Sequence, residues 1–206
     1  MPNPPALPTK NDLKKLPLGA IVAYAVRCAR RVQPLYGRAA GGAKLAKHEA
    51  AVEEAISLAE NFCLRHDVHA AAYGAAYAAR DAVDTAVAQD AARVASGAAR
   101  AAAYAFDIPQ SAVYEHAIYA SRVAAEADDA AQAAVRAADH AWADAQAVAA
   151  AARGDFERLL KLNHGTYPKV GDPIDPAEYG PLGPLWPEGP PAWFTAAKPA
   201  LRTKTT

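Results

Sequence analysis

The chain has 206 residues, with 22 Lys or Arg and 22 Asp or Glu, so its formal net charge at pH 7 is zero. No uncharged apolar stretch reaches the roughly 18 residues that a membrane-spanning helix needs, so no transmembrane segment and no membrane partner are expected. Two cysteines and no recognisable targeting segment predict reduced thiols in a cytoplasmic protein rather than a disulfide scaffold.

The N-terminus is rich in proline and lysine, and we expect residues 1–16 to form a disordered lead. A helical domain is expected over 17–165. Its first helix should begin near Pro17, because proline suits the first turn of a helix, and should end at Pro34, because proline disrupts a helix interior. The glycine-rich residues 37–42 then predict a loop.

A second helix is predicted over 43–66 from the apolar periodicity. One side of this helix is apolar, and another side carries Glu49, Glu53 and Glu60. A third helical segment is expected over 67–106, with Asp67 as its N-cap. Because that segment is long for a single globular helix, Gly74 and Gly97 are the expected bends or weak points.

Residues 70–152 are close to half alanine, the residue with the highest helix propensity. A fourth helix is predicted over 109–153, ended by Gly154, and a short fifth helix over 155–163. Small side chains allow helix backbones to approach closely. The sequence therefore predicts an all-α fold, an antiparallel bundle of four to five helices, two of them long and alanine-rich.

Residues 166–206 differ from the helical domain, because they are rich in proline and glycine and show no helical period. They also carry large apolar side chains, which disordered tails usually lack. We expect an extended strap that packs on the helices, with a recognition segment for another protein as the alternative. The aromatic residues of this region include Tyr167, Tyr179, Trp186, Trp193 and Phe194.

Catalytic motifs are incomplete in this chain. Residues 37–44 nearly spell a phosphate-binding loop, but the lysine comes one residue late, no Ser or Thr follows it and no strand precedes it. The serines are isolated and form no nucleophile elbow. The acidic group of Glu126, Asp128 and Asp129 has the pattern of an exposed face. We therefore expect a protein that is not an enzyme and has no cofactor.

Metal-binding patterns are weak. No histidine has a glutamate three residues before it, which argues against a di-iron carboxylate bundle. Cys63, His66 and His69 follow at steps of three, but they could converge on a metal only if the helix broke near residue 67. His140 has only Asp144 one turn away, and two ligands do not make a site.

Charge is distributed unevenly along the chain. Up to Lys47 there are nine Lys or Arg against one acidic residue, so the N-terminal part is basic and the remainder is acidic. The basic first helix is expected to neutralise acidic neighbours, and no aromatic residues interleave with its arginines as nucleic-acid binding would favour. The candidate partner-binding residues are Arg27, Arg30, Arg31, Glu126, Asp128, Asp129, Trp186 and Trp193.

Residues 25–36 (AVRCARRVQPLY) and 48–56 (HEAAVEEAI) carry a resemblance to a known family. Together with the alanine-rich helices, they resemble the alanine-rich helical immunity proteins of bacterial polymorphic-toxin systems. In that family a helix with a Cys-Ala pair ends in Pro-Leu-aromatic, and a helix with an Ala-(Ile/Val)-Glu core follows. The resemblance covers about residues 18–106 and does not extend to the proline-rich C-terminal region. The matching residues are Cys28, Ala29, Val32, Pro34, Leu35, Tyr36, Val52, Glu53 and Ala55.

The resemblance implies a non-enzymatic protein that binds and blocks a cognate toxin, and it supplies no catalytic or ligand-binding residues. Protein binding is therefore the leading hypothesis, with self-association left open. The alternatives are a metal- or small-molecule-binding bundle that uses His66, His69 or His140, and a structural scaffold.

Overall fold

The computed structural model describes residues 6–39, 45–65, 71–80, 86–108, 113–162 and 165–197. Within these ranges the chain forms eight helices and no strand, so the all-α prediction is confirmed. None of the described helices is long and apolar enough to cross a membrane. The helices are α1 (Lys10–Leu13), α2 (Leu18–Ala39), α3 (Leu45–Arg65), α4 (Ala71–Arg80), α5 (Ala86–Asp107), α6 (Val113–His140), α7 (Ala145–Lys161) and α8 (Ala192–Ala197).

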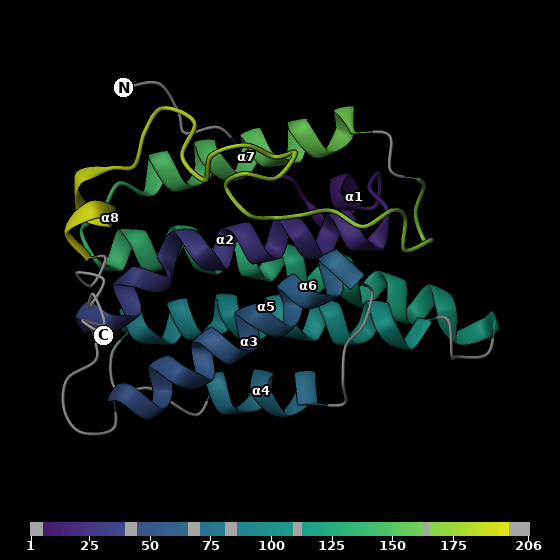
Figure 1. The fold of residues 1–206 in the computed structure, drawn as a ribbon, viewed down its shortest axis with the longest axis horizontal. Coiled ribbons are helices and arrows are strands. Elements are labelled where there is room, and N and C mark those ends of the chain that lie inside the picture. The colour runs from purple at the N-terminus through teal and green to yellow at the C-terminus, as the bar shows by residue number, and fades with distance from the viewer. Residues whose placement is uncertain are drawn as a thin grey trace, which may run out of the picture.

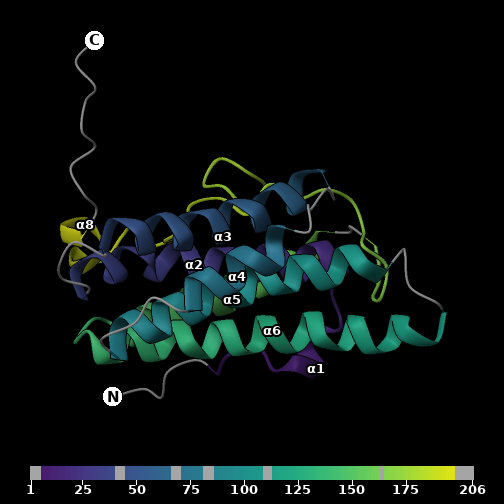
Figure 2. The ribbon, with the colours of Figure 1, turned by 90° about the horizontal axis from the view of Figure 1, so that it is seen from below.

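Helices α2 and α5 lie at the centre of the fold. α5 contacts α2, α3, α4 and α6, and α2 also contacts α6, α7 and α8. The long helices run roughly along the long axis of the molecule (Figure 1). The view from below keeps that alignment for α3, α5 and α6 (Figure 2). The fold thus places α2 between α3 on one side and α7 on the other.

Alanine and glycine bring α5 and α6 into close contact. A Cβ added at Gly97 would lie 3.2 Å from both the Ala130 Cβ and the Glu126 carbonyl oxygen, so a side chain there would crowd α6. Gly74 and Gly97 lie inside α4 and α5, so neither ends a helix; the predicted 67–106 segment is instead divided where α4 ends at Arg80 and α5 begins at Ala86. The missing side chain leaves room for α6 at Gly97, whereas a Cβ added at Gly74 would meet no atom within 4 Å.

Pro34 does not end the first helix, because α2 continues through it to Ala39. Proline removes one backbone hydrogen bond from a helix but does not forbid the helix from continuing. The following side chains Leu35 and Tyr36 are buried, and their packing offsets that loss. Residues 37–39 are therefore helical rather than part of a loop, while residues 40–44 lie outside the described ranges.

The predicted helix over 109–153 is also wrong, since α6 ends at His140 and α7 begins at Ala145. Trp142 in the intervening turn has a φ of 52°, and the Asp144 carboxylate caps α7 by accepting from the Ala147 amide at 2.9 Å. Asp is a strong N-cap residue, and this signal marks the helix start. Gly154 lies inside α7, so the predicted fifth helix is the second half of α7.

Part of the region predicted as a disordered lead is ordered. Thr9 and Asp12 form a reciprocal capping box at the start of α1, in which each side chain accepts a hydrogen bond from the backbone amide of the other. Leu13 and Leu16 are buried in the core. The predicted lead is therefore wrong for this stretch, which packs on the helical core.

Residues 165–197, called here the C-terminal segment, lie along α7 and α2 (Figure 1). The carbonyls of Lys169 and Val170 accept from the amides of Leu18 and Gly19 at 2.9 and 2.8 Å. The Ile174 amide donates to a carbonyl near the end of α3, at 2.9 Å. Because the first amides and last carbonyls of a helix lack partners within it, the segment completes the ends of two helices.

A buried ionic cluster fastens the segment to α2 and α7. Arg27 and Arg31 both donate to one carboxylate oxygen of Asp155, at 2.8 and 2.5 Å, and all three side chains are fully buried. Several N–H groups of the two guanidinium groups also donate to carbonyls of the segment, at 2.8–3.1 Å; these carbonyls belong to Pro176, Gly183, Pro184 and Leu185. Proline has no amide of its own, so these arginines supply donors that the segment lacks.

Replacing Asp155 with asparagine should destabilise the fold strongly, because two arginines would keep their positive charge without a buried counter-charge. We expect a loss of about 3–5 kcal/mol in the free energy of unfolding, measured by denaturant titration. Glu157→Gln on the same helix is the matched control, since Glu157 forms an exposed pair with Arg153 and should change stability by less than about 1 kcal/mol. Equal effects of the two substitutions would contradict the role assigned to Asp155.

Candidate functional site

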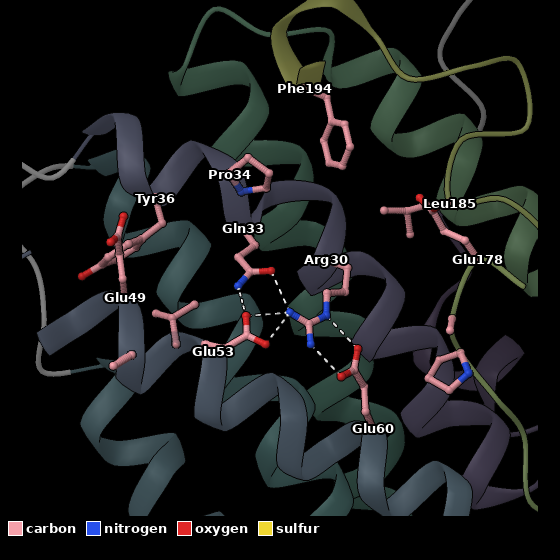
Figure 3. Close-up of a pocket in the computed structure, with 14 residues that line it drawn as sticks. Arg30, Gln33, Pro34, Tyr36, Glu49, Glu53, Glu60, Glu178, Leu185 and Phe194 are labelled. Atoms are coloured by element: carbon pink, nitrogen blue, oxygen red, sulfur yellow. Dashed lines mark hydrogen bonds and ion pairs between the residues drawn. The ribbon is translucent and has the colours of Figure 1, made fainter. Parts of the chain in front are cut away.

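A cavity of about 680 Å³ lies between α2, α3, the C-terminal segment and α8 (Figure 3). Cavities of roughly 300–1,000 Å³ are the usual size for binding sites. Its lining residues are Arg30, Gln33, Pro34, Tyr36, Glu49, Ala50, Val52, Glu53, Glu60, Pro176, Ala177, Glu178, Leu185 and Phe194. We call this cavity the α2–α3 pocket.

The α2–α3 pocket combines an apolar surface with an excess of negative charge. Proline, aromatic and aliphatic side chains form most of its walls. Arg30 is the single cation among the lining residues, whereas four carboxylates line the same space. Those carboxylates belong to Glu49, Glu53, Glu60 and Glu178.

Arg30 is held in the wall by a network of hydrogen bonds (Figure 3). Its guanidinium donates to both carboxylate oxygens of Glu60 at 2.7 and 2.6 Å, and to those of Glu53 at 3.0 and 2.8 Å. Gln33 accepts from the same guanidinium at 2.9 Å and donates to Glu53. Bidentate arginine–carboxylate pairs are among the strongest side-chain interactions, so this group forms a fixed wall.

The network shifts the pKa values of its members in opposite directions. Burial alone would lower the pKa of Arg30, but the hydrogen bonds with Glu60 and Glu53 outweigh it and raise that pKa. Burial alone would raise the pKa of Glu53, but the hydrogen bonds from Arg30 and Gln33 outweigh it and lower that pKa. Both groups are therefore charged at neutral pH.

Glu49 and Glu178 differ from the other two carboxylates of the pocket. Both are exposed, and neither forms a hydrogen bond or ion pair with another residue in the described parts of the chain. Glu49 comes from α3 and Glu178 from the C-terminal segment. In Figure 3 they lie on opposite sides of Arg30. The pocket thus has two uncompensated negative charges that face solvent.

A second, much smaller cavity of about 50 Å³ lies between α4, α5 and α6. Arg100 pairs with Glu126 in its wall at 2.6 Å, and Asp129 also lines it. Burial raises the pKa of Glu126, although the nearby Arg100 opposes this. Asp128 lies one turn from Gln132 and accepts from its amide at 2.9 Å. The structure thus uses Glu126 within the fold, although the sequence pattern suggested an exposed acidic face.

Two of the three arginines predicted to bind a partner are unavailable to one. Arg27 and Arg31 are fully buried and bonded to Asp155, and only Arg30 lines the α2–α3 pocket. The prediction was wrong because sequence position alone does not reveal burial. The acidic residue that pairs with them lies more than a hundred positions along the chain.

The tryptophans of the C-terminal segment pack with one another. Trp186 is buried and lies 5.7 Å from Trp193 and 5.3 Å from Phe194, centroid to centroid, in edge-to-face geometry. The Arg31 guanidinium lies 5.7 Å from the Trp186 ring. Trp186 is therefore a packing residue rather than an exposed partner-binding one, and the cluster positions Phe194 at the pocket.

The pocket was not predicted from the sequence, although the sequence contains one signal for it. Glu49, Glu53 and Glu60 follow at spacings of four and seven, which places them on one side of α3. This acidic side faces the pocket. The contribution of Glu178 had no comparable signal, because it reaches the site through an irregular segment.

The described residues do not support the metal-binding alternative. Among them, no group of three or more His, Cys, Asp and Glu side chains could hold a metal ion. Cys63 is fully buried, and its Sγ lies 3.9 Å from the Gly19 carbonyl oxygen. The His140 Nδ1 lies 3.1 Å from an Asp90 carboxylate oxygen. His66 and His69 lie outside the described ranges.

Comparison with known proteins gives no relative from which a role could be carried over: no family model, no curated protein and no solved structure matches the chain.

The Arg30 network predicts an acid-sensitive contribution to stability. The folded chain holds the pKa of Glu53 below its ordinary value of 4.5. The ionised carboxylate therefore stabilises the fold fully at pH values above 4.5, and this stabilisation is lost as the pH falls through the lowered pKa. Glu53→Gln should therefore lower the Tm near neutral pH, and the difference from the unmodified chain should shrink in acid. A Tm difference that stays constant from neutral pH to pH ~3 would contradict this assignment.

The two thiols should be unreactive in the folded chain. Burial raises the pKa of Cys28 to about 12 and raises that of Cys63 further, so the reactive thiolate is scarce at neutral pH. Iodoacetamide should alkylate them at least about a hundredfold more slowly in the folded chain than in denaturant. Rapid alkylation of the folded chain, followed by mass spectrometry, would show that one of these sites is open.

Proposed function

We propose that this chain is a non-enzymatic binding protein, an antiparallel helical bundle crossed by a C-terminal strap, that holds part of another protein in the α2–α3 pocket. The observation that carries the proposal is the pocket itself, an apolar cavity of about 680 Å³ with an excess of carboxylates. Pockets with an apolar lining and a few placed charges provide both affinity and orientation for a ligand.

The ionisation of the pocket favours binding over catalysis. A general acid or base works best with a pKa near the working pH, whereas the pKa of Glu53 is lowered. Arg30 is committed to two carboxylates, so it does not present a free guanidinium to a reacting group. These groups are suited to hold a ligand by charge and shape.

Neutralisation of a bacterial toxin is the form of binding that we favour. The resemblance of residues 18–106 to immunity proteins of polymorphic-toxin systems points in this direction. Such a protein blocks its partner by occupying a surface, so a rigid helical scaffold with one exposed pocket would suffice. The proposed partner is then the product of a neighbouring toxin gene.

Binding of a small organic molecule is the second candidate. The volume of the pocket falls within the range of small-molecule sites, and its walls come from elements far apart in the sequence. A small molecule would leave the solvent-exposed rim of the pocket unused. Protein binding therefore accounts for more of the pocket's surface than binding of a small molecule does.

Filling the pocket tests both candidates. Ala50 is exposed on α3 and lines the pocket, so Ala50→Trp should occupy the cavity, whereas Ala78→Trp adds the same side chain to the exposed side of α4. The partner used in this test is a toxin encoded beside this gene. We expect co-expression of the unmodified chain, or of Ala78→Trp, to protect cells from that toxin. Ala50→Trp should weaken binding at least about tenfold by calorimetry, because one buried contact region is lost.

The two tryptophan variants should have similar Tm values, so that a loss of binding reports on the pocket and not on folding. Protection by Ala50→Trp equal to that by Ala78→Trp would place the binding surface elsewhere. If the unmodified chain neutralises no toxin encoded nearby, the immunity proposal is wrong.

A further inference from the structure

We infer that the α2–α3 pocket is specific for an arginine or lysine carried by an apolar segment of the partner, with Glu49 and Glu178 as the carboxylates that receive the cation. The inference rests on the proposed protein-binding function and adds the chemistry of recognition to it. It assigns roles to two residues that form no hydrogen bond or ion pair with any other residue in the described ranges.

The net charge of the pocket lining favours a cationic ligand. Glu53 and Glu60 share the single positive charge of Arg30, which leaves that network with one net negative charge. Glu49 and Glu178 add two more, so the pocket lining carries three uncompensated negative charges. A cleft lined by one sign of charge concentrates its field and attracts ligands of the opposite sign.

The two exposed carboxylates reach the pocket from different parts of the chain. Glu49 is attached to α3 and Glu178 to the C-terminal segment, and the two lie on opposite sides of the Arg30 network in Figure 3. The pocket therefore presents an exposed carboxylate on each side of the network, and the two come from separate elements. Because both are exposed, they lose hydration only when a ligand covers them.

The apolar walls of the pocket favour a ligand in which apolar groups surround the cation. Pro34, Leu185 and Phe194 line the same cavity as the carboxylates. Arginine and lysine bury aliphatic stems along apolar surfaces while their charged ends remain at a polar rim. An apolar neighbour in the ligand would fill the remaining space. An acidic or phosphate-bearing ligand would instead meet three like charges.

The probe is the peptide acetyl-Leu-Arg-Leu-amide, compared with the same peptide in which citrulline replaces arginine. Citrulline has nearly the same shape but no charge. In an NMR titration of the full chain, we expect the arginine peptide to shift the amide signals of residues that line the pocket and to bind at least about tenfold more tightly than the citrulline peptide. Added salt should reduce that difference.

Substitution of the two carboxylates tests their assignment. Glu49→Gln together with Glu178→Gln should lower the affinity for the arginine peptide about tenfold and leave the affinity for the citrulline peptide unchanged. The matched control is Glu54→Gln together with Glu188→Gln, which removes one exposed carboxylate from each of the same two elements but none from the pocket lining. This control should bind both peptides as the unmodified chain does.

Equal affinity for the two peptides, absence of binding at millimolar concentration, or equal effects of the two double substitutions would overturn the inference. The partner protein separates this failure from that of the proposed function. If Ala50→Trp abolishes partner binding but the Glu49→Gln and Glu178→Gln pair leaves it unchanged, the proposed function stands and cation recognition is rejected. If the peptides bind as expected but Ala50→Trp does not affect partner binding, only the proposed function is rejected.

Discussion

The buried contact of Arg27 and Arg31 with Asp155 is the interaction on which the arrangement of this protein depends. Burial of charge is unfavourable unless each ion has a partner, and here one carboxylate serves two buried guanidinium groups and also pairs with Arg158 at 3.2 Å. The positive charge left over is met by backbone carbonyls of the C-terminal segment. The cluster therefore requires α2, α7 and the segment to be in place together.

The pocket follows from this constraint. Pro176 and Leu185, whose carbonyls accept from Arg27 and Arg31, also line the α2–α3 pocket. One face of α2 thus holds the segment, while Arg30 on a neighbouring face holds two carboxylates of α3. The alanine-rich helices α5 and α6 contribute a close-packed base behind these elements, as the contact at Gly97 illustrates. The site is therefore built at the border between the helices and the irregular segment.

The sequence predicted the parts of this fold that depend on local pattern. The helix expected over 43–66 corresponds to α3, and the helix expected near Pro17 begins at Leu18. Errors arose where tertiary packing overrode a local signal, as when α2 continued through Pro34 and α7 through Gly154. At the site, the acidic side of α3 was visible in advance, but the burial of Arg27 was not, because its partners lie at distant sequence positions.

Hydrogen exchange at the contacts between the segment and the helices tests this account most directly. The Gly19 and Ile174 amides donate across that boundary, to Val170 and Cys63. If the ionic cluster binds the segment into one cooperative unit, both amides should exchange only with global unfolding, at the free energy measured for core amides of α5. Exchange of the Ile174 amide through a local opening, orders of magnitude faster than that of the α5 core, would contradict it.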